Sequence, residues 1–108
     1  MVNNHAPLDR SFLALSHPIR REIVERLASG PATVGEATSD LPVSKPAISK
    51  HLKVLEQAGV LTRVIEGRSH RLSLREEALA PASDWIERQR ALWERKFDVV
   101  ETYLKEDA

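Results

Sequence analysis

The chain contains no cysteine. It therefore has no disulfide framework, no thiolate metal site and no cysteine nucleophile. It also lacks any apolar run approaching the roughly 20 residues that a transmembrane helix needs, and its polar first residues are not typical of a secretory signal. We therefore expect a cytoplasmic protein with no membrane partner. Its 108 residues are close to the usual size of one domain, so we expect a single domain over residues 1–108.

The chain also lacks a net charge, because 16 lysine and arginine residues balance 16 aspartate and glutamate residues. The charges are nevertheless distributed unevenly. Residues 43–75 contain seven basic and two acidic residues, so the rest of the chain is acidic. A basic segment on an acidic chain indicates a phosphate-facing surface, and the sequence predicts a nucleic-acid partner despite its zero total charge.

Residues 44–59 carry the most informative pattern in the chain. Ile48, Leu52 and Leu55 recur at helical spacing and form one apolar stripe. Ser44 can cap the amino end, and Gly59 can adopt the left-handed conformation that ends a helix. The segment is therefore predicted to be a helix with two faces. The face away from the stripe carries Lys45, Ser49, Lys50 and Lys53, with His51 near the stripe's edge.

Three short helices are predicted before this segment. The first covers residues 8–15, after a frayed end at residues 1–7, and the second follows a cap at either Ser16 or His17. Thr33 and Glu36 fit a capping box, which predicts a third helix over about residues 34–39. Two short helices joined by a tight turn, the second of them basic, are typical of a helix-turn-helix.

The segment after Gly59 changes to an extended pattern. Residues 60–65 and 69–74 are rich in branched side chains and flank Gly67, so they predict a β-hairpin. The sequence does not decide which side of the first strand faces the core. Either Val60 and Val64 or Leu61 and Ile65 could form its inner face. Residues 76–79 are expected to add one turn before a last helix over residues 81–105. The apolar residues of that helix cover more than one stripe, so part of it should meet a partner while part joins the core.

These elements predict a mainly α fold with a small β-hairpin. Over nearly its whole length the chain resembles the ArsR-type winged helix-turn-helix repressors, in residues 14–27, 44–61 and 66–68. The resemblance implies a homodimeric bacterial or archaeal transcriptional regulator that binds double-stranded DNA at a palindromic operator. It implies that helix 44–58 enters the major groove and that the hairpin at residues 60–74 is the wing. It also implies a dimer interface made by the first helix and the helix at residues 81–105.

The resemblance and the residue chemistry together predict two sets of site residues. Lysine can reach a guanine edge or a phosphate, and arginine at the hairpin tip suits the minor groove. Ser44 has two possible roles, as a helix cap or as a contact. The residues expected at the DNA are Ser44, Lys45, Pro46, Ser49, Lys50, His51, Lys53, Arg63, Arg68, His70 and Arg71. Those expected in the dimer interface are Leu8, Phe12, Trp85, Ile86, Leu92, Trp93 and Val100.

The chain departs from the metal-sensing members that it resembles. Those members carry a cysteine motif in the third helix or zinc ligands on the last helices, whereas this chain has no cysteine, and residues 76–108 have no histidine. His5, His17, His51 and His70 are scattered and have no adjacent carboxylate at ligand spacing. We therefore expect no metal, no cofactor and no catalytic site. The operator and any effector do not follow from the sequence.

Two other functions remain open at this point. The chain could be a protein-interaction module that uses its aromatic last helix, because winged helices do not all bind DNA. It could also sense a metal through histidine and carboxylate ligands. Steep salt dependence of DNA binding would argue against the first, and an unchanged operator affinity in zinc would argue against the second.

Overall fold

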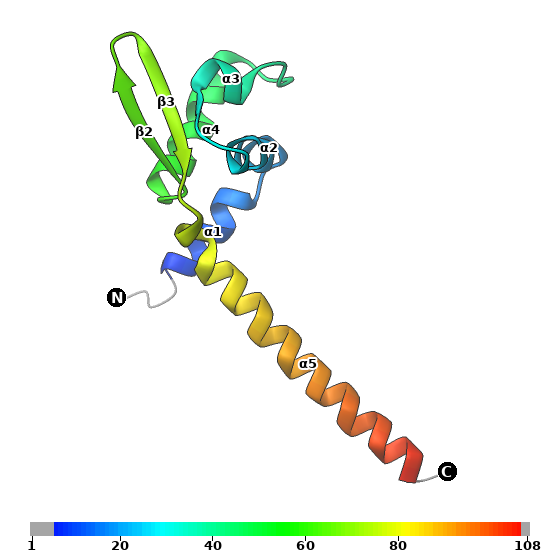
Figure 1. The fold of residues 1–108 in the computed structure, drawn as a ribbon. Helices are drawn as coiled ribbons and strands as arrows, with labels where there is room; N and C mark the ends of the chain where they lie inside the picture. Colours follow the sequence, from blue (N-terminus) through cyan, green and yellow to red (C-terminus); the bar gives the residue numbers. More distant parts are fainter. Residues whose placement is uncertain (1–5, 107–108) are drawn as a thin grey trace.

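The computed structural model describes residues 6–106, in which the predicted elements follow one another in the expected order (Figure 1). The helices and strands up to residue 79 form a body, and one long helix, which follows them in the chain, projects from it. The molecule measures 70 × 37 × 23 Å. The elements are α1 (Ala6–Leu15), α2 (Pro18–Ala28), β1 (Ala32–Thr33), α3 (Val34–Thr38), α4 (Lys45–Gln57), β2 (Leu61–Glu66), β3 (Ser69–Leu74), the 3-10 turn η1 (Glu76–Leu79) and α5 (Ala80–Glu106).

Some predicted boundaries and one strand differ from the structure. Helix α1 begins at Ala6, two residues before the predicted start, and residues 1–5 of the expected frayed end lie outside the described residues. Helix α5 begins at Ala80, one residue before Pro81. Strand β1 was not predicted, since it has only two residues, and it pairs with β3 to give an antiparallel sheet of order β1-β3-β2.

The predicted caps are present at three helix starts. His17 is the N-cap of α2, and its Nδ1 accepts a hydrogen bond from the Ile19 N–H at 3.1 Å, so it is His17, not Ser16, that caps this helix. Thr33 and Glu36 form the predicted capping box of α3, and the hydrogen bond from the Thr33 N–H lowers the pKa of Glu36. Ser44 caps α4 through the Ala47 N–H at 3.3 Å. Local hydrogen bonds therefore define where these helices begin.

Two glycines allow the chain to turn beside α4 and at the hairpin tip. Gly59 has φ 76° directly after the C-cap of α4, and Gly67 has φ 61° between β2 and β3. Both angles lie in the left-handed region, which side chains with a Cβ rarely adopt. The predictions that Gly59 ends the helix and that Gly67 forms the turn are confirmed.

The core lies between the helices and the base of the sheet. Leu52 and Leu55 of the predicted stripe are buried, and Ile48 packs against the core from its margin. The buried hydrophobic residues that surround them are Ala14, Ile19, Ile23, Leu27, Ala37, Val60, Leu61 and Leu72. Helix α4 is therefore held by its apolar stripe, which leaves the opposite side uncovered.

The first strand of the hairpin follows neither of the two alternations that the sequence left open. Val60 and Leu61 are both buried, whereas Val64 and Ile65 are 53% and 64% exposed. Val60 lies in the bend after α4, where its N–H bonds to the Leu55 carbonyl and its own carbonyl accepts from the Arg75 N–H. Burial decreases along β2, since Thr62 and Arg63 are half-buried and the residues from Val64 onward are exposed, where the outer part of the hairpin extends away from the body (Figure 1).

Only the first turns of α5 are packed against the body. Ala82 is buried, and Trp85 meets Phe12 of α1 edge-to-face, with ring centroids 5.8 Å apart. The buried Ser11 hydroxyl lies 2.7 Å from the Ala78 carbonyl oxygen and ties α1 to η1. Within residues 6–106, no helix combines the length and apolar character that crossing a membrane requires.

Candidate nucleic-acid interface

Helix α4 presents its basic side to solvent. Lys45, Ser49, Lys50 and Lys53 are all exposed, and they lie on the side of the helix away from Leu52 and Leu55. Ser44 and Pro46 are exposed at the amino end, where unpaired N–H groups and the helix dipole favour an anion. The helix is thus anchored to the core by its apolar side, while its other side carries side chains that are positively charged or can form hydrogen bonds. Such a helix can bind phosphates and base edges.

The structure places His51 at the edge of the apolar stripe, in contact with α2. Its Nδ1 lies 3.0 Å from an Nη atom of Arg20, and its ring centroid lies 4.3 Å from that of His17. Burial lowers the pKa of His51, and its electrostatic interactions with His17, Arg20 and Lys50 lower it further. Of the residues expected at the DNA, His51 is therefore the one on α4 whose ring is directed toward its own fold.

The predicted wing residues divide into two pairs. Arg63 lies 2.6 Å from an Oε atom of Glu56 on α4 and 2.9 Å from Nδ1 of His70, and both Arg63 and His70 are half-buried. Arg68 and Arg71 are exposed. Arg63 thus fastens the hairpin to the end of α4, while Arg68 and Arg71 remain open to a ligand.

A crevice lies between the hairpin and the start of α3. It has a volume of about 360 Å³, and its lining includes the basic side chains of Arg63, Arg68 and His70. Thr33, Val34 and Gly35 form the opposite wall.

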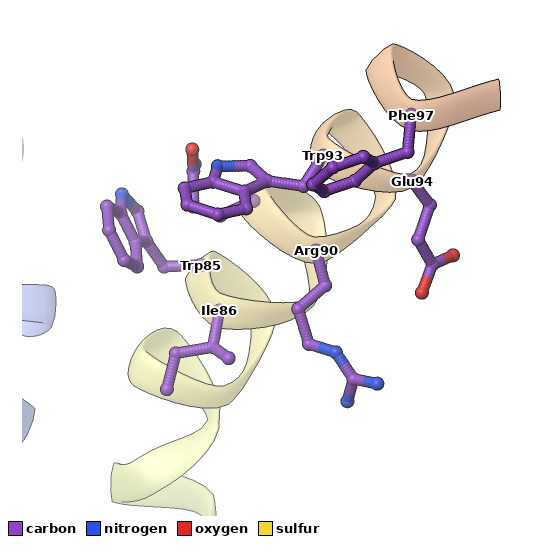
Figure 2. A pocket seen from close by; sticks show the side chains of 7 residues that line it. Trp85, Ile86, Arg90, Trp93, Glu94 and Phe97 are labelled. Atoms are coloured by element: carbon purple, nitrogen blue, oxygen red, sulfur yellow. The ribbon is translucent and has the colours of Figure 1, made fainter. Parts of the chain in front are cut away.

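A second exposed surface runs along α5. A groove of about 470 Å³ lies on this helix, and Figure 2 shows the indole rings of Trp85 and Trp93 projecting from it beside Ile86, Arg90 and Phe97. Trp93 is 64% exposed and Phe97 is 66% exposed. Large aromatic side chains in such positions mark a surface that another protein covers.

The residues expected in the dimer interface lie on this surface or at its base. Phe12 and Trp85 contact each other where α1 meets α5, and Leu8 is half-buried on α1. Ile86, Leu92, Trp93 and Val100 are exposed along α5. The interface residues predicted from the sequence do not include all of the exposed apolar residues on these helices. The others are Leu13 on α1 and Phe97, Val99, Tyr103 and Leu104 on α5.

The interpretation of the histidines as scattered is wrong for one pair. His17 and His51 are 34 positions apart in the chain, but the packing of α2 against α4 brings their ring centroids within 4.3 Å, with the ring planes tilted by 42°. His5 lies outside the described residues. Across residues 6–106, no three histidine, aspartate or glutamate side chains come together in a way that could hold a metal ion.

Sequence reasoning missed Arg20, which is 8% exposed and joins three helices. A signal was present, because Arg20 precedes Val24 by four residues and Leu27 by seven, which places it on the buried side of α2. A charged residue at such a position calls for internal partners.

The chain is similar to several known regulators. A helix-turn-helix domain family matches residues 15–64. Over 50 residues the chain is 62% identical to the HTH-type transcriptional regulator Rv2034 of Mycobacterium tuberculosis, an alignment that covers 46% of this chain and only 47% of that protein. It is 34% identical to the transcriptional repressor SdpR of Bacillus subtilis over 73% of this chain and 88% of that protein.

Solved structures extend the similarity to the whole fold. An ArsR family transcriptional regulator is 32% identical, with a TM-score of 0.78, over 87% of this chain and 97% of the other. An ArsR-like transcriptional regulator from Rhodococcus sp. RHA1 is 30% identical, also with a TM-score of 0.78, over 98% of this chain and 97% of the other. On this similarity in sequence and fold, the chain belongs to the ArsR family of winged helix-turn-helix transcriptional regulators.

Proposed function

We propose that the protein is a homodimeric repressor that binds an inverted-repeat operator through α4 and the wing. The observation that carries the proposal is the exposed basic side of α4, held on the core by Leu52 and Leu55. A helix of this kind fits the major groove of B-DNA, which admits one α-helix. Similarity to SdpR, which is itself a transcriptional repressor, supports repression over activation.

The exposed side chains suggest how the contacts are divided. Lys45, Ser49 and Lys50 lie in the first half of α4, which in a helix-turn-helix is the part nearest the base edges. Lys53 lies one turn later and suits a phosphate. Arg68 and Arg71 on the wing suit the minor groove, where negative potential is concentrated. Ser44 and Pro46 at the amino end of α4 are positioned for a backbone phosphate.

The apolar surface of α5 supports the proposed dimer. Ile86, Trp93 and Val100 are spaced by seven residues, and Phe97 and Leu104 are spaced in the same way. Seven-residue spacing keeps one seam of a helix facing a second helix. A second copy of the chain would cover this seam and place two α4 helices on one face of the DNA, about 34 to 36 Å apart.

Replacing Lys50 with alanine is expected to weaken operator binding by about 1 to 3 kcal/mol and to alter sequence preference, if the lysine contacts a base. Fluorescence anisotropy with the DNA upstream of the protein's own gene, and with single-base variants of it, measures both effects. Lys105→Ala is the matched control, because Lys105 is an exposed lysine on α5 that pairs only with Glu101 among the described residues. An equal loss of affinity for all of these DNA sequences would mean that Lys50 contacts a phosphate and not a base.

The exposed face of α5 also fits a protein-interaction module that does not bind DNA. The two functions differ in their dependence on salt. A repressor that releases counterions from several phosphates loses about 1,000-fold or more in affinity between 50 and 200 mM salt. Equal affinity for operator and scrambled DNA at physiological salt would contradict the repressor.

A further inference from the structure

The guanidinium of Arg20 is buried where α1, α2 and α4 meet. Its Nε lies 3.1 Å from the Ala14 carbonyl oxygen, and Nη2 lies 2.9 Å from the Leu13 carbonyl oxygen and 2.8 Å from Ser16 Oγ. These carbonyls belong to the last turn of α1, where the helix dipole favours a cation. Arg20 therefore caps the end of α1 from the neighbouring helix.

The remaining terminal nitrogen of the Arg20 guanidinium contacts α4. Its Nη1 lies 3.0 Å from Nδ1 of His51. Since a guanidinium can only donate, Nδ1 must accept, and His51 is neutral with its proton on Nε2. One planar group thus joins the end of α1 to the middle of α4, and α1 lies against the base of α5 through Phe12 and Trp85.

We propose that Arg20 is a positioning residue for DNA recognition, which holds α4 in its binding orientation by donating to Nδ1 of His51. The proposal rests on the proposed function, since it assumes that α4 reads the operator. It assigns His51 an indirect role, because the ring supports α4 instead of contacting DNA. A lysine could not replace Arg20, as its single ammonium group cannot span the α1 carbonyls and the imidazole.

The same link makes operator binding sensitive to acid. The charged and titratable groups near His51 are His17 and Arg20 from the α2 side and Lys50 on α4, and all of them oppose a positive charge on the ring. Protonation at Nδ1 would remove the acceptor and set a cation against Arg20. Affinity should therefore fall as the pH drops below the ordinary histidine value of 6.5, whereas a histidine that contacts phosphate would bind DNA more tightly there.

Two replacements of His51 test whether its ring holds α4 in position or contacts the DNA directly. In His51→Asn, the amide oxygen can take the place of Nδ1 as acceptor, while His51→Leu keeps similar bulk without an acceptor. We expect His51→Asn to bind the operator within about threefold of wild type and His51→Leu to lose about 10- to 100-fold, because a buried charged donor is left unpaired. Equal losses in both variants, or no loss in either, would overturn the proposal.

The pH profile and a folding check complete the test. His51→Asn should bind with less pH dependence than wild type between about pH 5.5 and 7.5, and since His17 is present in both, the difference belongs to His51. Circular dichroism establishes that each variant is folded. If His51→Leu is not folded, Arg20→Lys takes its place. We expect the same 10- to 100-fold loss of operator affinity from this variant, because about one hydrogen bond from a charged donor is missing. Unchanged affinity in a folded Arg20→Lys variant would overturn the positioning role.

A measurement without DNA separates this proposal from the proposed function. Nitrogen-15 NMR of the imidazole in the free wild-type protein should show His51 with its proton on Nε2. A proton on Nδ1 would overturn the positioning role even if the operator is bound. Absence of specific DNA binding by the wild type would instead overturn the proposed function, with the tautomer unaffected.

Discussion

Trp93→Asp is expected to leave the protein monomeric and to lower its operator affinity by about 100- to 10,000-fold, because two linked half-site contacts become one. Trp93 lies between Ile86 and Val100 on the seam of α5 and is 64% exposed in the single chain. A carboxylate there would have to be buried without a partner when a second copy packs against it. Light scattering during size exclusion measures the assembly, and anisotropy measures operator affinity.

Ala91→Asp is the matched control for this prediction. Ala91 is exposed on the same helix, two residues before Trp93, and therefore faces roughly the opposite side. The Ala91→Asp replacement introduces the same charge outside the seam, so it should leave both the dimer and the operator affinity unchanged. If Trp93→Asp stays dimeric, the seam is not the interface. If both variants dissociate, the added charge and not the surface is responsible.

Leu55→Ala is expected to lower the free energy of unfolding by about 2 to 5 kcal/mol. Leu55 is fully buried beneath the exposed lysines of α4, and its removal would leave a cavity between the recognition helix and the body. Urea denaturation followed by circular dichroism measures the change. For a small domain such a loss is a large part of the total stability.

Ile65→Ala serves as the comparison on the same protein. Ile65 is 64% exposed on the hairpin beyond the body, so its truncation removes little buried surface and should change stability by less than about 0.5 kcal/mol. An equal loss from both variants would mean that the hairpin is covered in solution. A small loss from Leu55→Ala would mean that α4 is not anchored by its apolar stripe.

Much of the fold could be predicted because its determinants are local. Ser44 and Thr33 cap helices through N–H groups three residues away, and Gly67 turns a hairpin through its own φ angle. The stripe of Leu52 and Leu55 depends only on helical spacing. For these residues the near neighbours in the chain decide the conformation, so the sequence alone was sufficient.

The candidate site was less predictable, because several basic residues are paired across the fold. Arg63 was expected at the DNA, but the packing of the hairpin on α4 brings it to Glu56, and the pairing of β2 with β3 brings it to His70. His51 was also expected there, and its ring lies against His17 instead. Nothing in the residue types distinguishes these arginines and histidines from exposed ones, since the distinction depends on which elements pack together.

The amino-acid sequence by itself determined the order of the helices and of the two hairpin strands, the caps at Thr33 and Ser44, and the basic face of α4, because each depends on residues within a few turns of one another. Only the tertiary structure decided that Arg20 joins α1 to α4 and that Val60 and Leu61 are both buried. It also decided where α5 leaves the body, just beyond the contact between Trp85 and Phe12. These outcomes require surfaces far apart in the chain to meet, and helical or strand periodicity carries no information about which surfaces those are.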